Sequence, residues 1–292
     1  MQKIMDSAYS KDTVPRFGKD STMLIDFHTH AFPEKLASRA IGVLAERANM
    51  VPETDGTISA LLSRMDEWHV DRAVVLNIAT NAHQQSKVNQ FVIDTLRAHG
   101  DRLTPLGSIY PIDSAAELGR LDEMDLLADA RIPGLKLHPD YMEHFLDDPA
   151  YTPILDRAAE MGMFVVLHTG MDVYSPDCIH ATPDMIRTVL RRHPKLNLIC
   201  AHYGGNCLWD TVEEKIAGER CYIDISMGVK MGLSVEQARR ILLRHDPDRI
   251  LFGSDCPWGD VPGNLAFLEA MRLPAELVDK ILYKNACTLL KL

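Results

Sequence analysis

The chain has 292 residues, of which 46% are hydrophobic and 25% charged, and its formal net charge is −10. The length suits a single α/β barrel, and the negative charge argues against a nucleic-acid partner, because phosphate binding needs an excess of Lys and Arg. No apolar run reaches the ~18 residues of a membrane helix, and no signal peptide opens the chain. The six cysteines form no C-x-x-C pair, so we expect a cytoplasmic protein with reduced thiols and no membrane partner.

The first 22 residues differ from the rest of the chain. They are polar and show no clear period, which is typical of an extension or of an arm that packs on a partner subunit. We therefore predict an N-terminal extension or arm, residues 1–22, and a single domain, residues 23–292. Such an arm would permit a homodimer.

From residue 23 onward, short apolar or β-branched runs alternate with helical patterns. Near-continuous apolar strands are what a parallel sheet covered on both faces requires. Start and stop signals mark the helices, among them an N-cap at Thr182 and a Ser-x-x-Gln box at Ser234 and Gln237. Helices are predicted within residues 57–70, 151–162, 182–194 and 234–247. The eight predicted strands lie within residues 23–30, 72–79, 103–111, 134–139, 164–170, 197–204, 221–227 and 249–258.

Eight strand–helix units without a break in composition predict an α/β fold, the (β/α)8 or TIM barrel. The main competitor is a doubly wound open sheet. That fold usually carries a Gly-rich phosphate turn, and no G-x-G-x-x-G follows any of the runs.

Histidine and aspartate recur where the predicted strands end. In such barrels the active site lies at the C-terminal ends of the strands. Alternation in the first run places Asp26, His28 and His30 on the face towards the barrel interior, and Phe27 on the other face. Four later strands end with His138, His168, His202 and Asp255.

This set of residues indicates a divalent metal. Buried polar residues cost free energy unless something satisfies them, and a metal bound by imidazole and carboxylate would do so. His28 and His30 can reach one ion together, and His168 and Asp255 would complete the ligands from across the barrel. An open position for water would then make the site catalytic. His202 is either a further ligand or a free base, and we favour the free base.

Two other residues near this site have simpler interpretations. His138 is as compatible with a capped loop as with the lining of a pocket. Lys136 alternates with leucines, so it is expected to point into the barrel, where a lysine must be paired, neutral or modified. An interior ion pair with Asp26 or Asp224 is the default prediction, and a carboxylated lysine that bridges two metals is the alternative.

The motifs DFHTH, GLKLHPD, LHTG, CAHYGG and LFGSDCPWG, in this order, resemble the amidohydrolase superfamily. More narrowly, they resemble its amidohydrolase-related branch, which includes aminocarboxymuconate-semialdehyde decarboxylase. The resemblance implies a barrel with one divalent metal, zinc in first place or manganese, and His202 as a catalytic group outside the ligand set. The metal ligands that it implies are His28, His30, His168 and Asp255.

The members of this branch differ in reaction. Our first choice is hydrolysis of an amide, ester or lactone of a small organic molecule, in which the metal lowers the pKa of bound water to ~7 and Asp255 transfers the proton. The alternative is non-oxidative decarboxylation of an aromatic or unsaturated acid, and the third option is a non-catalytic metal-binding barrel. The predicted substrate-binding residues are Phe32, Lys136, His138, Tyr203 and Trp258.

Decarboxylating members use arginine to hold a substrate carboxylate near the metal. No arginine directly follows the predicted strands 4 to 8. Lys230, after the seventh strand, is the nearest cation.

Overall fold

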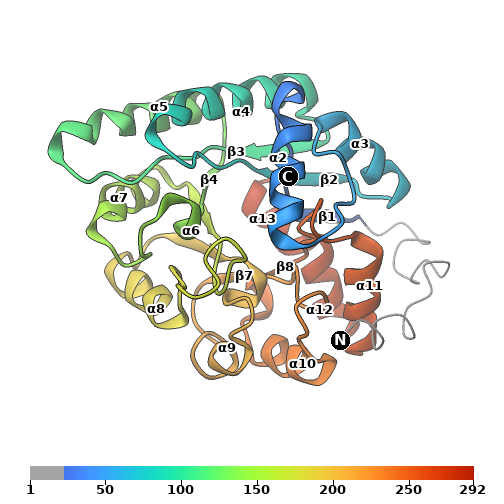
Figure 1. Ribbon diagram of the computed structural model, residues 1–292. Coiled ribbons are helices and arrows are strands. Elements are labelled where there is room, and N and C mark those ends of the chain that lie inside the picture. The colour runs from blue at the N-terminus through green and yellow to red at the C-terminus, as the bar shows by residue number, and fades with distance from the viewer. Residues whose placement is uncertain (1–22) are drawn as a thin grey trace.

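The computed structural model describes residues 23–292, so the predicted extension, residues 1–22, lies outside the described residues. Short parallel strands form the centre of the described part (Figure 1). The strands are β1 (Ile25–Thr29), β2 (Arg72–Leu76), β3 (Leu103–Leu106), β4 (Gly134–Leu137), β5 (Phe164–Leu167), β6 (Asn197–Cys200), β7 (Tyr222–Asp224) and β8 (Ile250–Leu251).

These strands close into a barrel. Hydrogen bonds join β1, β2 and β3 in one sheet and β4 to β8 in another, each in sequence order. Parallel bridges connect the two sheets at both seams, from Gly107 to Leu135 and from Thr29 to Cys256. The predicted (β/α)8 fold is therefore confirmed, and backbone hydrogen bonds also cross each seam, for example from the Lys136 amide to the Gly107 carbonyl and from the Phe27 amide to the Phe252 carbonyl.

Helices surround the barrel, and α2 crosses in front of β1 and β2 in this view (Figure 1). No helix in residues 23–292 is long and apolar enough to cross a membrane. The α-helices are α2 (Glu34–Ala48), α3 (Ile58–Glu67), α4 (Gln85–His99), α5 (Asp122–Asp129), α6 (Pro139–Met142), α7 (Thr152–Met161), α8 (Pro183–Arg192), α9 (Trp209–Lys215), α10 (Val235–Arg244), α11 (Val261–Ala270), α12 (Ala275–Asp279) and α13 (Asn285–Leu290). The 3₁₀ helices are η1 (Ala82–Gln84), η2 (Ala115–Leu121), η3 (Pro149–Tyr151), η4 (His202–Gly204) and η5 (Pro247–Arg249), and η6 (Lys280–Lys284) is a π-helix.

The helices begin where their capping residues predict. The Thr182 hydroxyl accepts a hydrogen bond from the Met185 amide at the start of α8, and Ser234 accepts one from the Gln237 amide at the start of α10. The capping box at Ser234 is only half formed, because the Gln237 side chain donates to Asp210 of α9 at 2.8 Å. Gln237 thus ties two neighbouring helices together.

The interior of the barrel holds an apolar layer below the strand ends. Phe27 of β1 lies 5.7 Å, between ring centroids, from Phe164 of β5, and these strands are not neighbours in the sheet order. Phe27 therefore points across the barrel, and the prediction that it faces outward was wrong. The register of β1 against β2 shifts between Asp26 and Thr29, which breaks the strict alternation on which that prediction depended.

Candidate metal centre and substrate cavity

Three side chains converge where β1 and β8 end. The Nε2 atoms of His28 and His30 lie 3.2 Å apart, and each is within 3.2 Å of the Asp255 Oδ1 atom, at 3.2 Å and 3.1 Å respectively. The Asp255 amide donates to the His28 carbonyl at 2.8 Å, so the backbone fixes the carboxylate beside the two rings. Two imidazoles and one carboxylate with their donor atoms this close match the ligand chemistry of a divalent metal.

The other nitrogen of each histidine ring is held by a neighbouring strand. His28 Nδ1 lies 2.8 Å from Asp224 Oδ2 of β7, and His30 Nδ1 lies 2.9 Å from the Leu76 carbonyl of β2. Such outer contacts orient metal-binding histidines. Burial disfavours a charge on His28, but Asp224 and Asp255 outweigh this effect and raise its pKa to about 9.

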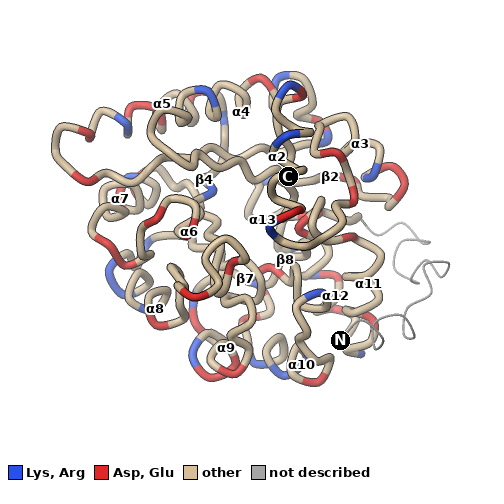
Figure 2. Tube along the Cα trace, viewed as in Figure 1, with Lys and Arg blue, Asp and Glu red and all other residues tan. Residues whose placement is uncertain are grey.

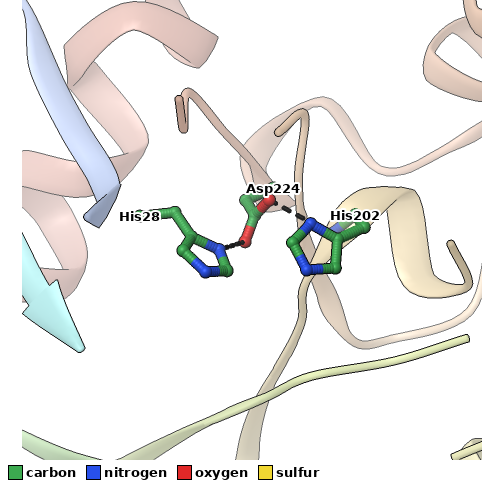
Figure 3. Close-up of side chains that lie close together, drawn as sticks. All are labelled: His28, His202 and Asp224. Atoms are coloured by element: carbon green, nitrogen blue, oxygen red, sulfur yellow. Dashed lines mark hydrogen bonds and ion pairs between the residues drawn. The ribbon is translucent and has the colours of Figure 1, made fainter. Parts of the chain in front are cut away.

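Asp224 also holds His202. Figure 3 shows Asp224 between the two histidines, in contact with the ring of His28 and the backbone amide of His202. The Ser226 hydroxyl donates to the same carboxylate and lies 2.8 Å from His202 Nδ1. Asp224 was expected from the sequence only as a partner of Lys136, and the positioning contacts of Asp224 and Ser226 were not foreseen.

His168 connects this centre to the β4–β5 side of the opening. Its Nδ1 atom lies 3.1 Å from His202 Nε2, and its Nε2 atom is buried without a hydrogen-bond partner. That Nε2 atom lies 3.5 Å from Asp172 Oδ2, and His138 Nε2 lies 3.6 Å from the same oxygen. The structure thus places His168 in a second group of possible ligands with His138 and Asp172, beside the group of His28, His30 and Asp255.

His138 combines the two interpretations that the sequence left open. It caps α6 through the Tyr141 amide, and it also lines the cavity above the metal centre. Its ring stacks between Tyr141, at 3.8 Å between centroids, and His168, at 4.2 Å. Burial lowers the pKa of His138 well below 6.5, so the ring is neutral at pH 7.

The donor set fits a metal. His168 Nε2 is an orphaned buried nitrogen on the floor that His28, His30 and Asp255 share, and an unsatisfied buried nitrogen is what a ligand position looks like without its ion. Asp172 was missed by the sequence analysis. The only signal for it is its place four residues after His168 in the loop that follows β5.

The expected ion pair of Lys136 with Asp26 or Asp224 is wrong. Asp26 binds the hydroxyl and amide of Ser254, at 2.5 Å and 2.9 Å, and Asp224 is occupied by the histidines. No carboxylate of residues 23–292 lies within 4.0 Å of the Lys136 ammonium, although the side chain is 1% exposed. Burial lowers the pKa of Lys136 to about 8, and its side chain lines the cavity.

A cavity of about 970 Å³ opens above this floor. Of the predicted substrate-binding residues, Phe32, Lys136, His138 and Trp258 line it, and Tyr203 does not. Tyr203 is fully buried because His202 and Tyr203 both adopt positive φ angles, of 56° and 59°, which turn the Tyr203 ring into the core against Trp209.

A second cation near the metal centre, besides Lys136, comes from an element that was not predicted to contribute one. Lys230 does not line the cavity, because its ammonium donates to the Trp258 carbonyl at 2.8 Å. Arg47 of α2 lines the cavity together with His168, His202 and Asp255. Its guanidinium lies 5.0 Å from the centre of the Tyr174 ring. Arg47 was not predicted from the sequence, because it lies on a helix between the first and second strands and not directly after strands 4 to 8.

Comparison with known proteins agrees with this geometry. The family model described as Amidohydrolase matches residues 25–292. The chain belongs to this amidohydrolase family. Among curated proteins, none matches this amidohydrolase.

Solved structures share the fold of this amidohydrolase at low sequence identity. An uncharacterized TIM-barrel protein from Bordetella bronchiseptica is 19% identical, with a TM-score of 0.70 over 92% of this chain and 98% of that one. A 2,6-dihydroxybenzoate decarboxylase complexed with 2,6-dihydroxybenzoate is 15% identical, with a TM-score of 0.66 over 93% and 100%. A 5-carboxyvanillate decarboxylase from Novosphingobium aromaticivorans, with bound manganese, is 13% identical, with a TM-score of 0.64 over 96% and 100%.

Proposed function

We propose that this amidohydrolase is a metal-dependent decarboxylase that removes CO₂, without oxidation, from an aromatic or unsaturated carboxylic acid. The observation that carries the proposal is the unpaired ammonium of Lys136, which is buried at the floor of the cavity that also holds the possible metal ligands. A buried cation without a carboxylate partner is costly, and a substrate carboxylate would satisfy it. The decarboxylases with the same fold support this reading over hydrolysis.

The metal would be held by His28, His30, His168 and Asp255. Zinc and manganese both suit imidazole and carboxylate donors, and the bound manganese of the Novosphingobium decarboxylase supports manganese as strongly as the donor set supports zinc. When bound, the metal would polarise the oxygen atoms of the acid and so help the carbon to accept electrons.

Side chains of the cavity would bind the substrate and transfer the proton. Lys136 and Arg47 hold the carboxylate, and the planar ring of the acid packs among the aromatic side chains of the cavity, Phe32 and Trp258. As the carbon–carbon bond breaks, CO₂ leaves and the electron pair stays on the ring carbon, which takes up a proton. We assign this proton transfer to His202, whose Nδ1 is tied to Ser226. Asp255 is the alternative, and as an ionised carboxylate it would first have to take up a proton from water.

The test combines elemental analysis with a panel of substrates. Protein loaded with zinc or with manganese is assayed for CO₂ release from aromatic and unsaturated acids. We expect release with at least one metal, and a loss of about 10² to 10⁴-fold in turnover for His202→Ala with the metal content unchanged. Loss of the metal from His202→Ala would instead make His202 a ligand, and an absence of CO₂ across the panel would contradict the proposal.

Hydrolysis of an amide, ester or lactone is the second candidate. The observation that favours it is the position of Asp255, whose pKa is held well below 3.8 by His28 and His30 against the effect of burial. Such a carboxylate is ionised at neutral pH and can accept a proton from water. The same loaded protein, tested on amides, esters and lactones, distinguishes the two reactions.

We further propose that the protein acts on small molecules in the cytoplasm and forms a homodimer. Light scattering of the purified full-length chain tests the last point. A mass of one chain would contradict the homodimer.

A further inference from the structure

The large cavity extends well beyond the metal centre, and helix α2 forms one of its walls. The residues of α2 that line it follow a helical stripe with the spacing i, i+3, i+4, i+7, i+8 and i+11, which is one face of a helix. Two of them remain exposed, Leu36 at 57% and Val43 at 46%, so these two side chains are largely uncovered by the described chain. The stripe consists of Leu36, Arg39, Ala40, Val43, Leu44 and Arg47.

The facing wall comes from η1 and α4 and shows the same spacing, i, i+3, i+4 and i+7, in Gln84, Lys87, Val88 and Phe91. The face of α4 that packs on the barrel is partly polar. Asn89 exchanges hydrogen bonds with the backbone of Ser108, at 3.0 Å and 2.9 Å. The core-facing side of α4 thus combines polar residues with Val92, which lies in the core, while Val88 and Phe91 line the cavity.

Lys and Arg residues also lie on both helices, α2 and α4 (Figure 2). Arg39 and Lys87 line the outer cavity and form no ion pair with residues 23–292. The chain as a whole carries a formal charge of −10. Two unpaired cations on the facing walls of one cavity therefore differ in sign from the net charge of the protein. They complement an anion.

The two basic residues of α2 that line the cavity, Arg39 and Arg47, mark its two ends. Arg47 lies near the metal centre, because it also lines the small inner cavity of about 70 Å³ with His168, His202 and Asp255. Arg39 lines only the outer part. Arg47 lies eight positions after Arg39 on the helix, a distance of about 12 Å along the axis, and apolar residues of α2 and α4 occupy the interval.

We infer that the outer cavity between α2 and α4 binds a second carboxylate of the substrate, which an apolar body connects to the carboxylate at the metal centre. The inference rests on the proposed function, since it names the class of acid on which that site acts: an elongated organic diacid. Arg39 and Lys87 hold the distal carboxylate. Leu36, Val43, Val88 and Phe91 cover the apolar body.

Binding of two matched acids to the metal-loaded full-length protein tests the inference. The probes are biphenyl-4-carboxylate and biphenyl-4,4′-dicarboxylate, which differ only in the distal carboxylate, and the readout is the dissociation constant by calorimetry. We expect the diacid to bind about tenfold more tightly, which is typical of one charged hydrogen-bonded contact. In the variant Arg39→Gln/Lys87→Gln the diacid should lose this advantage, and the affinity for the monoacid should stay the same.

Lys35→Gln is the matched control, because Lys35 is an exposed cation of α2 that does not line the cavity. It should leave the preference for the diacid unchanged. A diacid that binds no more tightly than the monoacid, or a preference that survives the double variant, would overturn the inference.

Binding is measured without turnover, so the two proposals fail separately. A preference for the diacid without CO₂ release contradicts only the decarboxylase. Release of CO₂ without that preference contradicts only the outer site.

Discussion

The two sides of the barrel opening treat their buried polar groups differently. On the side of β1, β7 and β8, both ring nitrogens of His28 and His30 have partners within the protein. On the side of β4 and β5, Lys136 has no carboxylate partner and His168 Nε2 has no hydrogen bond in the described chain. An unsatisfied buried group costs free energy. The histidines of the first side are therefore fixed in position by the protein, whereas the polar groups of the second side remain available to bind a ligand.

The largest effect is expected when the negative charge of Asp255, whose carboxylate contacts both His28 and His30, is removed. In Asp255→Asn the carboxylate beside His28 and His30 is lost, so we expect the metal content to fall from about one ion per chain to near zero and the activity to disappear with it. Elemental analysis and circular dichroism check the metal and the fold.

Asp172→Asn is the matched control on the second side. It should keep its metal, because Asp172 lies outside the group of His28, His30 and Asp255. If both variants lost the metal equally, the contrast between the two sides would be wrong for metal binding.

Lys136→Met should stabilise the fold and at the same time weaken the binding of acids. Burial lowers the pKa of Lys136 from 10.5 to about 8, so between these values the unfolded chain binds more protons than the folded one, and stability rises with pH. The cost of the buried ammonium is therefore fully present below pH 8. We expect the variant to be more stable than the native protein at pH 7, by about 2 to 3 kcal/mol, and to lose affinity for acids.

Urea unfolding at pH 7 and at pH 10 measures this difference, which should shrink as the pH rises. Lys35→Met, at an exposed position, should show neither the gain nor its pH dependence. A Lys136→Met variant that is less stable at pH 7 would mean that the ammonium is satisfied in the native state.

Asp224→Asn tests how far the first side depends on its outer contacts, because Asp224 orients His28 and is not itself one of the proposed metal ligands. The carboxylate orients His28 through a contact of 2.8 Å, and loss of such an outer partner typically costs 10 to 100-fold in metal affinity. Competition with a chelator measures the change. An unchanged affinity would show that His28 needs no support from β7.

The sequence predicted the barrel and the strand ends well, because both depend on local periodicity. Apolar runs and helical patterns alternate along the whole chain, so each strand–helix unit supports the prediction of the others. The orientation of Phe27 was not predictable, since the register shift in β1 arises from pairing with β2, which one strand alone does not encode. The predicted ion pair of Lys136 was wrong for a similar reason. Alternation indicates the face of the strand on which a side chain lies, but it does not identify the residue opposite.

The cavity wall was the largest omission. Helix α2 carries a clear stripe of apolar and basic residues. Such a stripe predicts that one face of the helix is in contact with something, but it does not distinguish the protein core from a bound ligand. The signal for Arg47 in the sequence is its place on a helical stripe that mixes leucine and valine with arginine.

The smallest expected effect lies outside the barrel, where the polar groups are satisfied locally. Ser234→Ala removes the hydroxyl that accepts from the Gln237 amide, so the unfolding free energy should fall by about 1 kcal/mol, with the metal content and the activity unchanged. Urea unfolding measures the loss. The Gln237 side chain bonds Asp210 rather than Ser234, so the effects of Gln237→Ala and Asp210→Ala should overlap in a double-mutant cycle. Coupling of Gln237→Ala with Ser234→Ala instead would mean that the full capping box forms in solution.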